Sequence, residues 1–127
     1  MSQALLDSLV DEPGFTPVTA DMLDAYLAEG ARCATALFFT GDPEKKLETA
    51  DVAVVLRELV RMHPGSLRVG IIARSDEKTL MKACKVMLFP SVAFFSGQKH
   101  LETIAKIQDW SVYEEKIPHI LSRADAA

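Results

Sequence analysis

Two short apolar segments on either side of a helix-length segment most constrain how this chain can fold. Ala34–Thr40 has the length of a strand and no alternation of polar residues, so we expect it to be buried on both faces of a sheet. Leu67–Ala73 is a second apolar strand, and Asp51–Met62 between the two is predicted to be a helix. A strand–helix–strand unit joins two parallel strands by a right-handed crossover. The chain is therefore predicted to have an α/β fold.

The remaining segments extend this unit in both directions. Before it, we expect a helix at Ser2–Val10, an extended segment at Phe15–Val18 and a helix at about Asp21–Glu29. After it, the pattern predicts a helix, a strand, an edge strand and a last helix, at Asp76–Cys84, Ser91–Phe95, Lys99–Lys106 and Trp110–Leu121. The two later strands are joined by a hairpin turn and pair antiparallel. We therefore predict a mixed central β-sheet with helices on both faces.

The length of 127 residues indicates a single domain, 1–127, in which residues 1–18 are an N-terminal helix and an extended lead-in. Met22 and Trp110 are expected in the core, because each lies on the apolar face of a predicted helix. Pro118 is expected to distort the last helix. Residues 122–127 are expected to be a frayed tail.

The net charge of −4 argues against general binding to nucleic acid. The first positive side chain is Arg32, so the N-terminus resembles neither a secretory signal nor a transit peptide. The longest nearly apolar stretch, Met87–Phe95, is too short to cross a bilayer, which takes roughly 20 residues. We therefore expect a cytoplasmic protein that does not insert into the membrane.

Cys33 and Cys84 are the only cysteines, and they are too far apart in the sequence to form a redox or zinc motif. A structural disulfide is not expected in a reducing compartment, so both are interpreted as small buried apolar residues. The three histidines, His63, His100 and His119, lack the spacing of metal ligands. The sequence therefore indicates no metal site, no cofactor and no catalytic residues.

Several of these segments resemble thioredoxin. The resemblance lies in the order of the elements, in Phe38-Phe39 at the end of the first buried strand, and in Phe89-Pro90-Ser91 before the third. It implies a thioredoxin-like fold in which Pro90 follows a cis peptide bond. Thioredoxins carry Cys-x-x-Cys after the Phe-rich strand, but residues 41–47 contain no cysteine. Disulfide exchange needs an attacking and a resolving thiol, so that reaction is absent from this loop.

The chain more closely resembles the HyaE/HupG family of hydrogenase maturation proteins. The similarity covers residues of about 12 to 121, although no single motif is diagnostic. The segments that carry it are Gly14–Val18, Leu23–Leu27, Asp42-Pro43, Glu58-Leu59, Val69–Ala73, Phe89-Pro90 and Asp109-Trp110. One departure is Lys106, where the family pattern leads us to expect glycine.

The resemblance implies a non-catalytic cytosolic chaperone. Its partner would be the precursor of the small subunit of an uptake [NiFe] hydrogenase, and its ligand the twin-arginine signal peptide of that subunit. Other hydrogenase maturation proteins are further expected partners. Arginine pairs well with carboxylates, and the peptide's apolar stretch needs an apolar surface. We therefore predict a partner-binding site formed by Asp42, Glu44, Glu48, Asp51, Val52, Val55, Phe89 and Ser91, around Pro90 as a structural cis-proline.

Other interpretations remain open. The four acids can be a solvated loop, Val52–Leu56 can be a buried part of a helix, and the acidic N-terminal stretch can bind arginines instead. The chain could also be a thiol oxidoreductase that uses only Cys33 or Cys84, or a generic interaction module with another partner. The sequence does not tell which hydrogenase is served or whether a peptide or a folded surface is bound. The edge strand Lys99–Lys106 also permits a homodimer.

Overall fold

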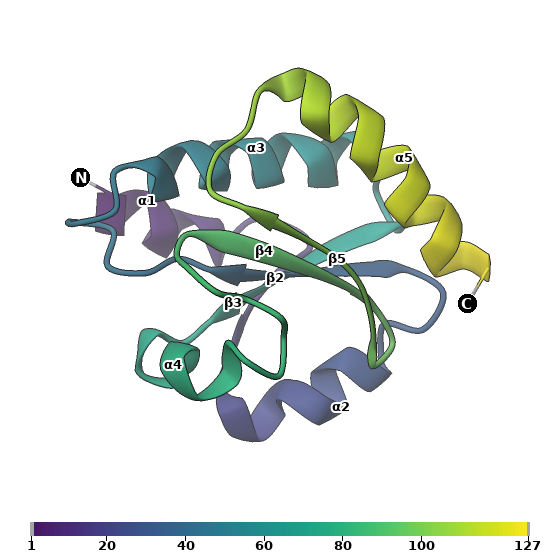
Figure 1. The fold of residues 1–127 in the computed structure, drawn as a ribbon, viewed down its shortest axis with the longest axis horizontal. Coiled ribbons are helices and arrows are strands. Elements are labelled where there is room, and N and C mark those ends of the chain that lie inside the picture. Colours follow the sequence, from purple (N-terminus) through teal and green to yellow (C-terminus); the bar gives the residue numbers. More distant parts are fainter. Residues whose placement is uncertain (1, 127) are drawn as a thin grey trace.

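The computed structural model describes residues 2–126, which form a five-stranded mixed sheet with helices on both faces (Figure 1). The elements are, in chain order, α1 (Ser2–Leu9), β1 (Phe15–Val18), α2 (Leu23–Ala28), β2 (Ala34–Phe39), α3 (Glu48–Met62), β3 (Leu67–Ile72), α4 (Glu77–Leu80), β4 (Ser91–Ser96), β5 (Lys99–Ala105) and α5 (Trp110–Ala126). Helices α1, α3 and α5 cover one face, and α2 and α4 cover the other. The predicted architecture is thus confirmed.

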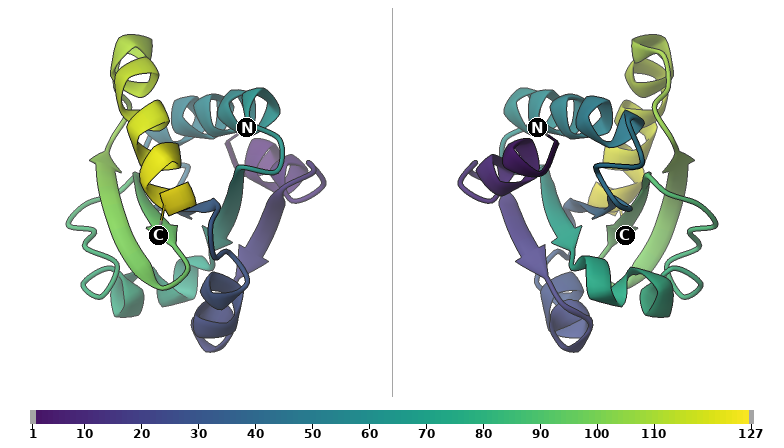
Figure 2. Two further views of the ribbon diagram at one scale, coloured as in Figure 1. Left: turned by 90° about the vertical axis from the view of Figure 1, so that its right-hand side faces the viewer. Right: turned by 90° about the vertical axis from the view of Figure 1, so that its left-hand side faces the viewer.

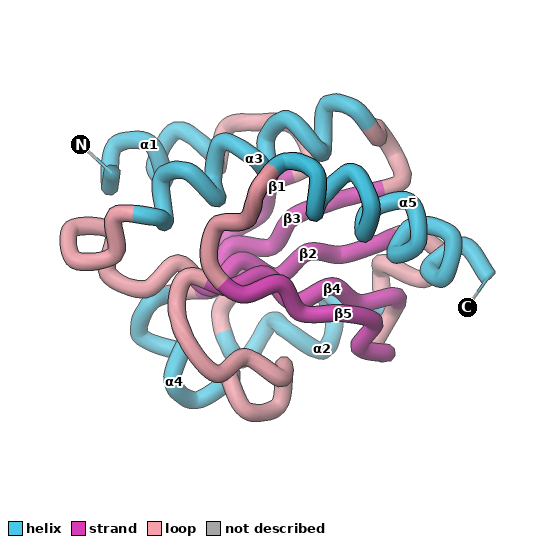
Figure 3. The backbone as a smooth tube through the Cα atoms, turned by 45° about the horizontal axis from the view of Figure 1, so that its top comes forward, coloured by secondary structure: helices cyan, strands magenta, loops and turns pink. Residues whose placement is uncertain are grey.

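The strands are arranged in the order β1-β3-β2-β4-β5 (Figure 3). Strands β1 and β2 both run parallel to β3, as the crossover connection requires. Strand β4 lies antiparallel to β2 and forms a hairpin with β5. The segment Phe15–Val18, expected only to be extended, is an edge strand of the sheet.

The central strand β2 separates two apolar cores, one on each face of the sheet. Because side chains alternate along a strand, Ala36 and Phe38 point to one core, and Leu37 and Phe39 point to the other. The first core is closed by α1, α3 and α5, and the second by α2 and by the segment that follows α4 (Figure 2). Every residue of β2 is buried, as the sequence predicts.

Helix α3 begins at Glu48, three residues earlier than the sequence pattern suggests. The helix predicted at Asp76–Cys84 is a 3-10 turn and only one turn of α-helix, Glu77–Leu80. The prediction of burial is wrong for two residues, because Met22 and Trp110 are each 40% exposed. Met22 ends a 3-10 turn rather than lying within α2, and Trp110 is the first residue of α5, where its ring lies tilted beside Tyr113.

The predicted fraying of the C-terminal tail is wrong for residues 122–126. Helix α5 continues to Ala126, and Pro118 lies inside it without ending it. The tail is held because Ala124 is only 1% exposed and its carbonyl accepts a hydrogen bond from Ser96 Oγ at 3.2 Å. Arg123 Nη2 donates to the Leu101 carbonyl at 2.7 Å. Ala127 lies outside the described residues.

Lys106 has a backbone φ of +59°, in the left-handed region that glycine adopts at the lowest cost. Its N–H donates to the Pro90 carbonyl at 2.8 Å, so this conformation joins the end of β5 to the start of β4. The family pattern's glycine at this position therefore has a conformational explanation. Lysine adopts the same backbone conformation here.

The packing of the tail predicts different effects for two neighbouring alanines. Ala124→Asp is expected to lower the free energy of unfolding by about 2–3 kcal/mol, because it buries a carboxylate without a partner. Ala126→Asp is the matched control: it lies on the exposed side of the same turn, so we expect a change within about 0.5 kcal/mol. Urea denaturation measures both. Equal effects of the two variants would contradict the described packing of the tail.

Candidate functional site

The candidate site lies where β2 ends and β4 begins. The Phe89–Pro90 peptide bond is cis, which confirms the prediction for Pro90. The Phe89 ring is stacked on that of Phe39, with 6.3 Å between the ring centroids and 4° between the planes. Phe89 lines two hollows, one of about 240 Å³ shared with Asp42 and one of about 170 Å³ shared with Glu48. The partly exposed Phe89 ring therefore contributes to two concave surfaces at this end of the sheet.

A buried carboxylate holds the loop after β2. Glu77 is 3% exposed, and its Oε2 accepts hydrogen bonds from the Gly41 N–H at 3.0 Å and from the Thr40 hydroxyl at 3.4 Å. Thr49 Oγ1 of α3 donates to the Thr40 carbonyl at 2.6 Å. Gly41 has a φ of +67°, and a Cβ there would lie 2.8 Å from Phe89 Cβ. The loop is thus fixed between α3, α4 and the cis-proline segment.

Burial raises the pKa of the Glu77 carboxyl above its usual value, because the ionised form loses hydration. The hydrogen bonds from Gly41 and Thr40 and the positive charge of Arg74 oppose this shift without cancelling it. Glu77 was not among the predicted site residues. Its neighbours Asp76 and Lys78 are charged, so the local sequence is typical of a solvated surface.

Two of the four predicted site acids are engaged within the protein. Asp42 Oδ1 accepts a hydrogen bond from the Glu44 N–H at 3.0 Å, and its Oδ2 lies 3.8 Å from Arg74 Nη2. Glu48 Oε1 accepts a hydrogen bond from the Ile107 N–H at 3.1 Å. These two carboxylates therefore stabilise the loops around the site, and each would have to share its oxygens to bind a ligand.

The other two acids, Glu44 and Asp51, are exposed. They share this end of the molecule with Lys45, Lys46 and Lys106, which line the smaller hollow. Acidic and basic side chains are therefore interspersed. The structure does not bring the four predicted acids together into one pocket.

The other four predicted contacts, Val52, Val55, Phe89 and Ser91, are placed differently from one another. Val52 and Ser91 are each 2% exposed, so they belong to the interior and offer no surface to a partner. Val55 is partly buried against the first core, whereas its neighbour Val54 is 39% exposed. Ser91 Oγ donates to the Leu88 carbonyl at 2.8 Å and so shapes the cis-proline segment. Of these four residues, Phe89 alone lines either of the two hollows.

The structure adds three exposed apolar residues that sequence reasoning did not select. Met87 is 91% exposed, Leu47 is 79% exposed and Leu88 is 39% exposed. Leu47 and Phe89 line the same hollow, and Met87 and Leu88 directly precede Phe89 in the chain. We call these four residues the Phe89 surface. A signal was available for Leu47, which follows Lys45 and Lys46 in a polar segment. Met87 gave none, because it begins the longest nearly apolar stretch of the chain.

The two cysteines lie in different environments. Cys84 is 2% exposed, and burial raises the pKa of its thiol to about 11. It is therefore almost wholly protonated at neutral pH, and the thiolate is the reactive form. Cys33 is partly buried just before β2, and its Sγ lies 3.4 Å from the Gly30 carbonyl. It is at the other end of β2 from the Phe89 surface.

No cluster of three or more His, Cys, Asp or Glu side chains that could hold a metal ion is found among residues 2–126. None of the helices in the described part of the chain has the length and apolar content needed to span a bilayer.

Comparison with known proteins identifies the family. The family model described as hydrogenase-1 expression protein HyaE matches residues 5–113. The chain belongs to the HyaE family. It is 40% identical over 112 residues to the hydrogenase expression/formation protein HupG of Bradyrhizobium diazoefficiens, covering 87% of this chain and 76% of that one. It is 35% identical over 122 residues to HoxO of Azotobacter vinelandii, covering 96% and 80% respectively.

Solved structures support the same assignment and the fold. A crystal structure from Rhodopseudomonas palustris, described as a hydrogenase expression/formation protein HupG, superposes with a TM-score of 0.60 at 38% identity. That match covers 88% of this chain and 99% of the other. Fasciola hepatica thioredoxin superposes with a TM-score of 0.67 at 13% identity, covering 82% and 97% respectively. The fold is therefore thioredoxin-like, and membership of the family places the chain in hydrogenase maturation.

The raised pKa of Glu77 predicts a pH-dependent difference in stability. The folded state binds the Glu77 proton more tightly than the unfolded state, so this stabilisation is present at low pH and is lost as the pH rises through the raised pKa. We therefore expect wild type to lose stability relative to Glu77→Gln between about pH 4.5 and pH 7. Urea denaturation at both pH values measures the difference.

Glu115→Gln is the matched control, because Glu115 is exposed on α5. Its stability difference from wild type should change little over the same pH range. If the stability difference between wild type and Glu77→Gln stays constant with pH or changes in the opposite direction, ionisation of Glu77 does not destabilise the folded state.

The environments of the cysteines predict their order of alkylation. In the native protein, iodoacetamide should modify Cys33 faster than Cys84, because Cys84 is buried and its thiol is protonated. In about 6 M guanidinium chloride the two rates should converge, because unfolding removes the burial. Mass spectrometry of tryptic peptides measures both rates. Faster native labelling of Cys84 would contradict its placement in the core.

Proposed function

We propose that this protein is a non-catalytic chaperone that holds the precursor of a hydrogenase small subunit in the cytoplasm by its twin-arginine signal peptide. Membership of the HyaE family supports the role in hydrogenase maturation. The absence of cysteine from residues 41–47 and the raised pKa of the buried Cys84 thiol weigh against thiol chemistry at this end of the sheet. The bound species and the mode of binding are the proposal.

The Phe89 surface is the observation that carries the proposal. Leu47 shares a hollow with the partly exposed Phe89 ring, and the exposed Met87 and Leu88 directly precede Phe89 in the chain. Exposed apolar groups that gather in one place mark interaction sites. Among the described residues, the backbone N–H and carbonyl of Phe89 make no backbone hydrogen bond. An extended apolar segment could therefore pair with this backbone while its side chains contact Met87 and Leu47. The apolar stretch of a signal peptide has this chemistry.

The arginine pair is assigned to the exposed acids beside the Phe89 surface. Lys45, Lys46 and Lys106 line the smaller hollow and would repel guanidinium groups there. Glu44 and Asp51 are exposed and make no ion pair among the described residues, so their carboxylates are free to accept both hydrogen bonds of a guanidinium fork. The arginines would then lie outside the hollow, and the apolar stretch would lie over Phe89.

Calorimetric titration with the signal peptide of a hydrogenase small subunit tests the proposal. We expect a Kd of about micromolar order for the Arg-Arg peptide and weaker binding of a Lys-Lys peptide, because an ammonium lacks the planar fork. Met87→Ser should raise the Kd about tenfold by removing apolar contact area. Met62→Ser is the matched control, because Met62 is 55% exposed elsewhere on the surface and should leave the Kd unchanged.

Two results would overturn parts of the proposal. Absence of binding to both peptides would remove the signal-peptide mechanism and favour recognition of the folded subunit. Binding that Met87→Ser leaves unchanged would remove the Phe89 surface as the site. A double variant, Glu44→Gln with Asp51→Asn, should abolish the preference for Arg-Arg over Lys-Lys, and a retained preference would reassign the arginine contacts.

A further inference from the structure

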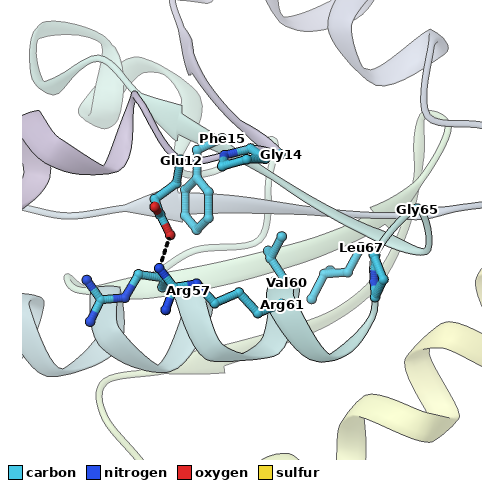
Figure 4. Close-up of a pocket in the computed structure, with 10 residues that line it drawn as sticks. Glu12, Gly14, Phe15, Arg57, Val60, Arg61, Gly65 and Leu67 are labelled. Carbon is cyan, nitrogen blue, oxygen red and sulfur yellow. Dashed lines mark hydrogen bonds and ion pairs between the residues drawn. The ribbon is translucent and has the colours of Figure 1, made fainter.

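Another concave surface lies at the opposite end of the sheet from the Phe89 surface. It is a hollow of about 340 Å³ between the segment entering β1, the second half of α3 and the turn before β3 (Figure 4). Strands β1 and β3 begin here, whereas the candidate site follows the end of β2, which is parallel to β3. The two sites are therefore separated by the length of the strands. We call this the Arg57 hollow.

The walls of the Arg57 hollow are largely apolar. Phe15 of β1, Val60 of α3 and Leu67 of β3 face one another across it (Figure 4). Gly14 contributes to its shape, because it has a φ of +90° and a Cβ there would lie 3.0 Å from Val60 Cγ1. A volume of about 340 Å³ is at the small end of the range for ligand sites. It can receive one large apolar side chain.

Two arginines lie at one end of the hollow. Arg61 Nη2 is 2.7 Å from Glu12 Oε1, and this ion pair connects α3 to the segment entering β1. Arg57 extends along α3 beyond that pair, at the far end from Leu67 (Figure 4). Arg57 Nε is buried and has no hydrogen-bond partner among the described residues. A buried donor without a partner is rare and costly. Arg57 lines the hollow and makes no ion pair among the described residues, so its guanidinium has capacity for a carboxylate.

We propose that the Arg57 hollow binds a segment of a protein partner that carries a large apolar side chain next to a carboxylate. The apolar side chain fills the space between Phe15, Val60 and Leu67, and the carboxylate accepts hydrogen bonds from the Arg57 guanidinium. Charge complementarity selects an acidic segment, because Arg61 is paired with both Glu12 and Glu58, whereas Arg57 makes no ion pair among the described residues. The hollow is open on one side, which suits a side chain attached to a polypeptide better than an enclosed small molecule.

This proposal is independent of the signal-peptide proposal, because it concerns the opposite charge and the opposite end of the sheet. An acidic, apolar segment differs from a twin-arginine peptide, so the chain could hold two partners at once. Such an arrangement fits an accessory factor that brings a precursor to another protein.

A two-dimensional ¹H–¹⁵N NMR titration with acetyl-Leu-Glu-amide tests the proposal. We expect shifts at the backbone amides of Gly14, Val60 and Leu67 and at the Arg57 Nε–H signal, with a weak Kd of about millimolar order for so small a probe. Acetyl-Leu-Gln-amide has the same shape without the charge. It should bind about tenfold more weakly, because it lacks the charge-assisted hydrogen bond.

Variants that change the charge at the Arg57 hollow are expected to change the affinity for the Leu-Glu probe in opposite directions. Arg57→Gln should weaken binding of the Leu-Glu probe about tenfold and leave binding of the Leu-Gln probe unchanged. Arg57→Lys should weaken it less, because it keeps the charge but loses the fork. Glu12→Gln should strengthen binding, because it removes a negative charge from the lining of the hollow while Arg61 keeps its other carboxylate partner, Glu58. Arg74→Gln, at the other end of the sheet, is the matched control and should have no effect.

Three outcomes would overturn the proposal. They are no shift at the hollow with about 10 mM of the Leu-Glu probe, equal affinity for the two probes, and weaker binding in Glu12→Gln. Amide spectra of each variant establish that it is folded before titration. Failure here would leave the signal-peptide titration unaffected, because that experiment measures variants at the Phe89 surface.

Discussion

The burial of β2 on both of its faces is the constraint on which the rest of the structure depends. Ala36 and Phe38 need helices above the sheet, and Leu37 and Phe39 need helices below it. Full burial of each large side chain contributes roughly 1.5–3 kcal/mol, so neither layer can be removed without a large loss. Because β2 is central, the loop that follows it leaves the sheet between the two layers. That position brings the loop against α3, α4 and the cis-proline segment.

The sequence was sufficient to predict elements whose burial appears in a local pattern. The two inner strands, the crossover helix and the hairpin follow from runs of apolar residues and from turn residues. Ala124 shows where this reasoning fails. Alanine gives no strong periodic signal, and what orders the tail is packing and a hydrogen bond from Ser96 of a distant strand. For Trp110 the pattern predicts burial that the structure does not have, because a residue on the apolar face of a helix can still be exposed at the end of that helix.

The surroundings of Pro90 could be predicted from the sequence only in part. Resemblance located the cis bond at Pro90, and two of the predicted acids, Asp42 and Glu48, each share a hollow with Phe89. Their engagement could not be predicted, because the Asp42–Arg74 ion pair joins loops that are distant in sequence. Glu77 could not be predicted as a site residue for the same reason. Only the tertiary fold places this carboxylate, from a charged segment, beneath the loop that follows β2. The two apolar cores can thus be predicted from the sequence, whereas the hydrogen bonds of the candidate site can be identified only from the structure.

The outer edge of β1 limits how this sheet can meet another one. Val69 N–H donates to the Gly14 carbonyl, so along β1 the groups of alternate residues bond to β3, and Phe15 and Pro17 face away. Phe15 N–H already donates to the Glu12 carbonyl, and proline has no N–H. This edge therefore presents carbonyl groups but no donor, and an incoming strand needs both. Growth of the sheet by addition of a foreign strand, the usual route to aggregation and strand exchange, is thereby confined to the edge formed by β5.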